Sequence, residues 1–109
     1  MDTRYVQQLV TDFYNRLAQS IPIEDLIVFG SYLSGTAGAD SDVDVVVVSE
    51  AFQGQTEDDR MRLLDQAAEG IDPVIEAWGF TASELRQAGK LTTLGHARDH
   101  GLKYSQMGK

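Results

Sequence analysis

The chain has 109 residues, enough for one domain with one core and one cleft but too few for a separate substrate-recognition domain. Its 17 acidic and 9 basic residues give a formal net charge of -8. This charge argues against a stand-alone nucleic-acid binder, because phosphate backbones are held by clustered Lys and Arg. The absence of cysteine excludes a disulfide framework and a Cys-based zinc site.

Neither a signal peptide nor a membrane span is visible in the sequence. The N-terminal residues carry charges and lack a continuous apolar core. No apolar run approaches the ~20 residues that span a bilayer. We therefore expect a single domain over residues 1–109 that is soluble, cytoplasmic and independent of membranes.

The first expected helix covers residues 3–19, where apolar side chains recur at steps of three and four. Ser20-Ile21-Pro22 ends it, because the residue before a proline is driven out of helical geometry. An uninterrupted apolar run over residues 26–29 predicts a strand covered on both faces. The apolar face of the helix consists of Val6, Leu9, Val10, Phe13 and Leu17.

Two further strands are expected downstream. Residues 32–39 hold two glycines among small residues and predict a short helical turn that runs into a loop. Residues 42–48 are strongly β-branched and predict a central strand. Residues 72–78 predict a third strand, opened by Pro73, since proline in a sheet is confined to strand starts and edges.

Helices are expected between and after these strands. Thr56 begins a helix with acids in its first turn, and Gly70 ends it. Thr81 opens a short helix with a Thr-x-x-Glu capping box. A last helix near residues 92–100 precedes an edge strand at residues 102–104. This order predicts an α/β fold in which a small mixed sheet is packed with helices.

The strand expected at residues 42–48 carries two carboxylates, Asp42 and Asp44, among valines. Residues two apart on a strand point to the same face, so the two side chains emerge side by side. Adjacent carboxylates in an apolar strand repel each other and lose hydration unless a cation neutralises them. Magnesium prefers one or two carboxylates together with substrate phosphates. The pair is compatible with a metal site, although an exposed strand with two solvated acids explains it equally well.

Gly30-Ser31 directly follows the strand expected at residues 26–29. Such a junction presents free backbone N–H groups and a hydroxyl, and glycine has no side chain that would block a phosphate. An ordinary strand-to-helix turn also favours Gly and Ser, so this dipeptide alone leaves both interpretations open.

The two features together are much more specific than either alone. In the string GSYLSGTAGADSDVDVVV, ten residues separate Gly30-Ser31 from Asp42-x-Asp44, and Ser41 directly precedes the first aspartate. This string resembles the signature of the polymerase-beta-like nucleotidyltransferase superfamily, in particular its minimal nucleotidyltransferases. The resemblance implies the nucleotidyltransferase fold for the whole chain.

The resemblance also implies a role for each residue of the motif. Gly30 and Ser31, together with Ser41, would bind the phosphates of a nucleoside triphosphate, ATP in the first instance. Asp42 and Asp44 would ligate Mg²⁺ that bridges those phosphates, and both would be catalytic.

The family uses a third catalytic carboxylate on a neighbouring strand, and the matching position here is Glu76. Asp72 competes for this role, because residues 72, 74 and 76 share one strand face. Pro73 places Asp72 at the edge of the strand, so we choose Glu76. A glutamate where the family more often has an aspartate adds one methylene of reach.

Minimal nucleotidyltransferases that resemble this chain often act as antitoxins of HEPN-type ribonucleases. The resemblance therefore implies transfer of AMP from ATP to a hydroxyl, a tyrosine of a HEPN-type toxin partner. An inactive antitoxin that neutralises its partner by occlusion is one alternative. A small-molecule nucleotidyltransferase is another, which the short chain disfavours.

One departure from the family concerns positive charge. Small active members carry basic residues after the Gly-Ser pair, where this chain has Tyr32, Leu33 and Ser34. This departure is compatible with weak activity, with an Arg or Lys supplied by a partner, or with a lost activity in a retained fold. Substrate recognition would come from a partner, a homo-oligomer or a shallow local pocket.

Four aromatic residues are expected to contribute to the core rather than to a platform on which a base stacks. They are Phe13, Phe29, Trp78 and Phe80.

Overall fold

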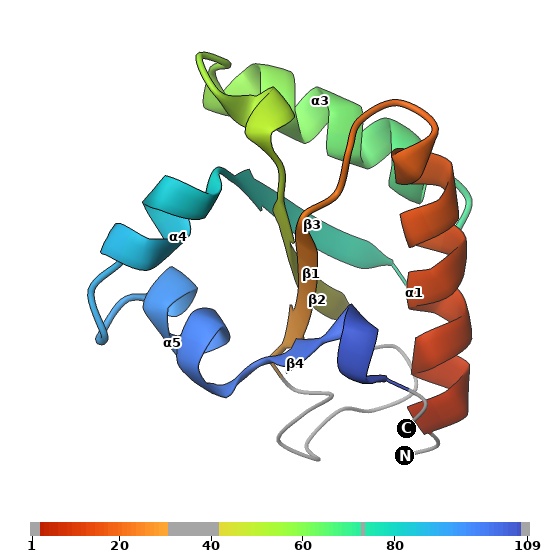
Figure 1. Ribbon diagram of the computed structural model, residues 1–109. Helices are drawn as coiled ribbons and strands as arrows, with labels where there is room; N and C mark the ends of the chain where they lie inside the picture. Colours follow the sequence, from red (N-terminus) through yellow and green to blue (C-terminus); the bar gives the residue numbers. More distant parts are fainter. Residues whose placement is uncertain (1–2, 31–41, 73, 108–109) are drawn as a thin grey trace.

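The structure is a computed structural model that describes residues 3–30, 42–72 and 74–107. Its strands form one mixed sheet in the order β3-β2-β1-β4 (Figure 1). Strand β1 runs antiparallel to both of its neighbours, β2 and β4, whereas β2 and β3 are parallel. The strands span Asp25–Phe29 (β1), Val43–Val48 (β2), Ile75–Phe80 (β3) and Leu102–Lys103 (β4). The predicted α/β fold with a small mixed sheet is confirmed.

Helices cover both faces of this sheet. Helices α1 and α3 lie on one face, and α4 and α5 lie on the other (Figure 1). Helix α3 lies in the connection between the parallel strands β2 and β3, which a short hairpin cannot join. In the described parts of the chain, no helix is long and apolar enough to cross a membrane. The helices span Thr3–Ala18 (α1), Glu57–Ala68 (α3), Ala82–Gln87 (α4) and Thr93–His100 (α5), with 3-10 turns at Glu50–Phe52 (η1) and Tyr104–Gln106 (η2). The helical turn expected at residues 32–39 lies outside the described residues.

The two faces of the sheet bury different residues, because side chains alternate along a strand. The α1/α3 face carries the apolar stripe of α1, as predicted, and alternate strand residues. From β1 and β2 these are Leu26, Val28, Val43, Val45 and Val47. The α4/α5 face carries the residues between them, namely Ile27, Phe29, Val46 and Val48. Because Val43 and Val45 face α1 and α3, Asp44 faces the opposite side.

Strand β3 begins and ends later than the sequence predicts. Its pairing with β2 starts at Val74, whose carbonyl accepts a hydrogen bond from Val43 at 2.8 Å. It continues through Gly79 to Phe80, and the ring of Phe52 fills the space that a side chain at Gly79 would occupy. A glycine inside a strand often marks such a close approach. Asp72 therefore precedes the strand instead of opening it.

Helix starts follow the predicted capping residues. Thr56 accepts a hydrogen bond from the backbone N–H of Asp59 at the start of α3. At the start of α4, Thr81 accepts from the N–H of Glu84, and the Glu84 carboxylate accepts from the N–H of Thr81 at 2.7 Å. This reciprocal pair is the predicted capping box.

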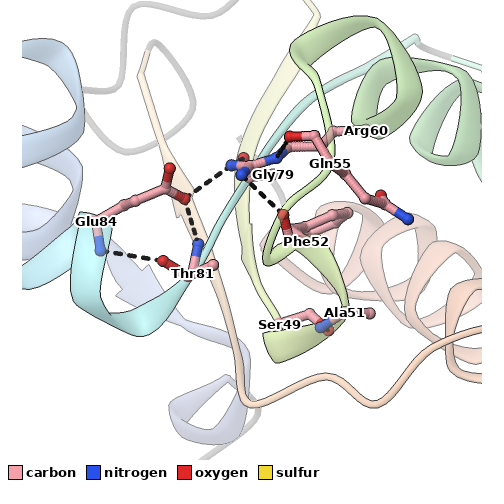
Figure 2. A network of polar contacts seen from close by, with 8 residues as sticks. All are labelled: Ser49, Ala51, Phe52, Gln55, Arg60, Gly79, Thr81 and Glu84. Carbon is pink, nitrogen blue, oxygen red and sulfur yellow. Dashed lines mark hydrogen bonds and ion pairs between the residues drawn. The ribbon is translucent and has the colours of Figure 1, made fainter.

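Arg60 of α3 connects four segments of the chain (Figure 2). Its guanidinium donates to the carbonyls of Phe52 at 2.8 Å, Gln55 at 3.2 Å and Gly79 at 3.1 Å. It also pairs with the Glu84 carboxylate at 2.7 Å. The side chain of Arg60 is only 12% exposed. Arg60 therefore holds η1, the end of β3 and the start of α4 together, at the opposite end of β3 from Glu76.

Candidate active site

Gly30 lies against the side chain of Asp44. It follows β1 directly, and its φ of +84° falls in the left-handed region that favours glycine. Phe29 is the register partner of Asp44, so the chain turns away from the sheet beside this carboxylate. A Cβ atom at position 30 would collide with Oδ2 of Asp44. Both the backbone conformation and the contact therefore require glycine here.

Asp44 and Glu76 lie side by side on the α4/α5 face. They are register partners on the parallel strands β2 and β3, and paired residues point to the same side of a sheet. Glu76 is exposed and Asp44 is half-buried. Asp42 is exposed and precedes β2 by one residue. The fold thus brings three of the predicted residues, Asp42, Asp44 and Glu76, to one end of the β2–β3 pair.

Negative charge accumulates at this end of the sheet. The pKa of Asp44 is raised above its usual value, first by burial and then by the nearby carboxylates of Glu76 and Asp42. Within residues 3–30, 42–72 and 74–107, no ion pair involves any of the three. Three acids without a neutralising cation destabilise the charged form of Asp44, so the arrangement favours a positively charged ligand.

The family comparison agrees with the residues gathered at this end. The family described as Nucleotidyltransferase domain matches residues 10–92, a range that includes Gly30, Asp42, Asp44 and Glu76. The chain belongs to this family. The nucleotidyltransferase resemblance seen in the sequence motif is confirmed. A comparison with curated proteins gives no match.

Solved structures share the nucleotidyltransferase fold of this chain. A protein from Sulfolobus solfataricus, classed as a nucleotidyltransferase, has a TM-score of 0.65 and 21% identity over 79% of this chain and 76% of that chain. A toxin-antitoxin structure with AMP-PNP has a TM-score of 0.62 and 23% identity over 86% of this chain and 70% of that chain. At these identities the likeness establishes the fold.

The carboxylates of this nucleotidyltransferase domain fit a hard divalent cation such as Mg²⁺, which takes oxygen ligands. Among the described residues, no group of three or more His, Asp or Glu side chains is arranged to hold a metal by itself. Magnesium does not require such a group, because it is usually bound by one or two carboxylates plus substrate phosphates and water. Asp42 and Asp44 can supply the protein ligands, and burial together with the carboxylates of Glu76 and Asp42 raises the pKa of Asp44.

Several predicted features of the site lie outside the described residues. These are the phosphate-binding candidates Ser31 and Ser41, and the segment from Tyr32 to Ser34 that replaces the family's basic residues. Asp72, the competitor of Glu76, is described. It precedes β3, and its carbonyl accepts a hydrogen bond from the hydroxyl of Tyr5 at 3.1 Å.

An apolar hollow of about 210 Å³ adjoins the carboxylates, and the sequence analysis missed it. Two of the aromatic residues expected in the core, Trp78 and Phe80, are only partly buried and line this hollow, whereas Phe13 is fully buried. Strand alternation could have indicated it, because residues 76, 78 and 80 share one face. The hollow is lined by Phe29, Val46, Trp78, Phe80, Thr93 and Leu94.

Proposed function

We propose that the chain transfers AMP from ATP to a hydroxyl group, that of a tyrosine on a HEPN-type toxin partner. The observation that carries the proposal is the contact of Gly30 with Asp44, which lies beside Glu76. At this place, backbone without a side chain lies next to carboxylates that have no positively charged partner among the described residues. Membership of the nucleotidyltransferase family supports the reaction class. The toxin-antitoxin structure with AMP-PNP supports an adenine nucleotide and a toxin as ligands.

Each residue of the site has its own role in an in-line transfer. Gly30 would let the backbone approach the triphosphate, and Asp42 and Asp44 would hold Mg²⁺. The ion, when bound, neutralises and aligns the phosphates. Glu76 accepts the proton of the acceptor hydroxyl. The hydroxyl oxygen forms a bond to the α-phosphorus as the bond to pyrophosphate breaks, which leaves AMP on the acceptor.

The decisive test is calorimetric titration of ATP with Mg²⁺ into the wild-type chain and into an Asp42→Asn, Asp44→Asn double variant. We expect the double variant to lose at least about tenfold in affinity, equivalent to ~1.4 kcal/mol, because both metal ligands lose their charge. Asp72→Asn is the matched control, since Asp72 lies outside β3, and it should bind ATP as the wild type does. Equal binding by all three proteins would overturn the assignment of the aspartates.

The role of Glu76 is tested separately, with labelled ATP and a HEPN-type partner. Glu76→Gln should retain ATP binding but lose transfer, because an amide accepts no proton from the hydroxyl. Asp72→Asn should transfer normally. The reverse pattern would make Asp72 the third carboxylate.

An antitoxin that acts by occlusion is the second candidate. Tyr32, Leu33 and Ser34 favour it, since they replace the family's basic residues and offer the triphosphate no cation. Cells that express the partner distinguish the two functions. The Asp42→Asn, Asp44→Asn variant protects them under occlusion and fails to protect them under AMP transfer.

A further inference from the structure

The apolar hollow on the α4/α5 face has no role in the chemistry described so far. It lies between the sheet and the start of α5. Strands β1, β2 and β3 each supply part of its floor, and Thr93 and Leu94 supply the wall from α5. Phe29 and Trp78 meet in it at a ring distance of 5.8 Å and an interplanar angle of 45°.

Strand register places the hollow beside the candidate active site on the same face of the sheet. Phe29 is the register partner of Asp44, and directly paired residues on antiparallel strands have Cβ atoms ~5 Å apart. Trp78 follows Glu76 by two residues on the same face, a rise of ~7 Å. A ligand in the hollow would therefore lie next to the Asp44–Glu76 pair.

The volume of the hollow suits one aromatic ring. A buried apolar cavity of about 150 Å³ is known to take up benzene, whereas sites for drug-sized ligands occupy at least about 300 Å³. At about 210 Å³, the hollow accepts a substituted six-membered ring but is too small for a whole nucleoside.

The lining of the hollow favours a phenol over a purine. Among the described residues that line it, the polar side-chain groups are the Thr93 hydroxyl and the Trp78 indole N–H. A purine carries polar nitrogens around most of its rim, and burying them without partners is costly. A phenol carries a single hydroxyl at one end of an apolar ring, and aromatic rings pack well in tilted geometry against Phe29 and Trp78.

We propose that this hollow is the acceptor subsite and takes the phenolic ring of a tyrosine side chain, with its hydroxyl directed toward Asp44 and Glu76. This inference rests on the proposed function. In the reaction, the phenol proton passes to Glu76, the phenolic oxygen bonds to the α-phosphorus, and pyrophosphate leaves. Specificity for tyrosine over serine or threonine then comes from ring burial.

The test uses Trp78, the only tryptophan of the chain, as a reporter. The protein is labelled with 5-fluorotryptophan and its ¹⁹F resonance is followed during titration with p-cresol, without ATP or metal. We expect a saturable shift with a Kd on the order of 1 mM, as befits so small a ligand. Cyclohexylmethanol and adenosine, titrated in the same way, should bind at least about tenfold more weakly.

A variant that fills the hollow supplies the second measurement. Thr93→Phe places a ring in the hollow from an exposed position, whereas Leu91→Phe adds the same ring at a fully exposed residue outside it. Only Thr93→Phe should abolish p-cresol binding. In AMP transfer to N-acetyl-tyrosinamide, Thr93→Phe should raise KM for this acceptor at least about tenfold and leave KM for ATP unchanged.

The outcomes separate this inference from the proposed function. Normal ATP binding with no saturable p-cresol shift, or with tighter binding of adenosine, would overturn the acceptor subsite alone. Absence of ATP binding in the calorimetric test would overturn the nucleotidyltransfer and the subsite with it. Equal effects of Thr93→Phe and Leu91→Phe on p-cresol binding would also contradict the subsite.

Discussion

Gly30 satisfies two independent requirements at one residue. Its φ of +84° is costly for any residue with a Cβ atom. In addition, a Cβ atom at this position would collide with Oδ2 of Asp44. Gly70 has nearly the same backbone conformation, with φ of +80°, but nothing lies within 4 Å of the place where its Cβ would be. The two glycines therefore allow the two requirements to be measured separately.

We expect Gly30→Ala to destabilise the protein more than Gly70→Ala. The shared left-handed conformation costs about 1–2 kcal/mol in each variant, and the collision with Asp44 adds about 1–3 kcal/mol in Gly30→Ala alone. Urea denaturation measures both free energies of unfolding. Equal losses in the two variants would show that Asp44 moves aside without cost.

At the residue scale, spacing and resemblance named candidate site residues but did not predict their surroundings. Gly30, Asp42, Asp44 and Glu76 were found from spacing and resemblance, and the fold brings the three acids to one end of the β2–β3 pair. Glu76 lies in β3 beside Asp44 and Asp72 precedes the strand, and the choice of Glu76 as the third carboxylate stays a prediction. The contact between Gly30 and Asp44 was not predictable, because it depends on the register of β1 against β2. The hollow was not predicted either: the shared face of residues 76, 78 and 80 indicates part of its floor, but the pattern does not indicate that α5 packs beside it.

The Arg60–Glu84 pair acts at the level of elements, since it ties α3 to the start of α4 (Figure 2). The hydrogen bond from Arg60 is the main reason that the pKa of Glu84 lies below its usual value. A lowered pKa in the folded state means that the ionised carboxylate stabilises the fold. This contribution is complete at pH values above the unfolded pKa of about 4.5 and is lost as the pH falls through the lowered value.

Glu84→Gln is therefore expected to destabilise the protein at pH 7, by up to about 1 kcal/mol, because the carboxylate is 44% exposed and the pair is partly screened by water. The difference from the wild type should shrink as the pH falls below about 4.5. Urea denaturation at pH 7 and at pH 3 measures it. Asp65→Asn removes the same charge from an exposed position of α3 and should show no comparable loss at pH 7.

Helices and strands were predictable where local sequence signals determine their bounds, and the observed bounds differ where tertiary contacts determine them. Helix α1 follows from its apolar stripe, and α3 and α4 follow from the caps at Thr56 and Thr81. The end of β3 was expected at Trp78, yet the strand continues through Gly79 to Phe80, with the ring of Phe52 in the space beside Gly79. The residue pattern along one strand does not indicate that the ring of Phe52, from η1, packs against it.

The whole molecule carries a formal net charge of -8, and its self-repulsion opposes the compact state. We expect the melting temperature to rise by a few degrees when NaCl increases from about 10 mM to about 150 mM, because salt screens this repulsion. Differential scanning calorimetry measures the shift.

MgCl₂ at the same ionic strength should raise the melting temperature further, because the proposed magnesium site exists only in the folded protein. The Asp42→Asn, Asp44→Asn variant is the control, and it should respond to MgCl₂ only as it responds to NaCl. An identical magnesium response in both proteins would show that the ion acts through general screening.

Arg60 also affects the tendency of this protein to aggregate through the edge of its sheet. Strand β3 forms one edge of the sheet, and the carbonyls of Val74 and Phe80 accept hydrogen bonds from the β2 side. Because backbone groups alternate in direction along a strand, the N–H and C=O groups of Ile75, Ala77 and Gly79 point away from β2. An outward edge is a template on which a strand of a second molecule can pair and begin an aggregate. Because Arg60 occupies the Gly79 carbonyl with a buried positive charge, it interrupts this template and shortens it to the stretch from Ile75 to Ala77. The guanidinium that holds three segments together within one molecule thus limits the pairing of β3 with a strand of a second molecule.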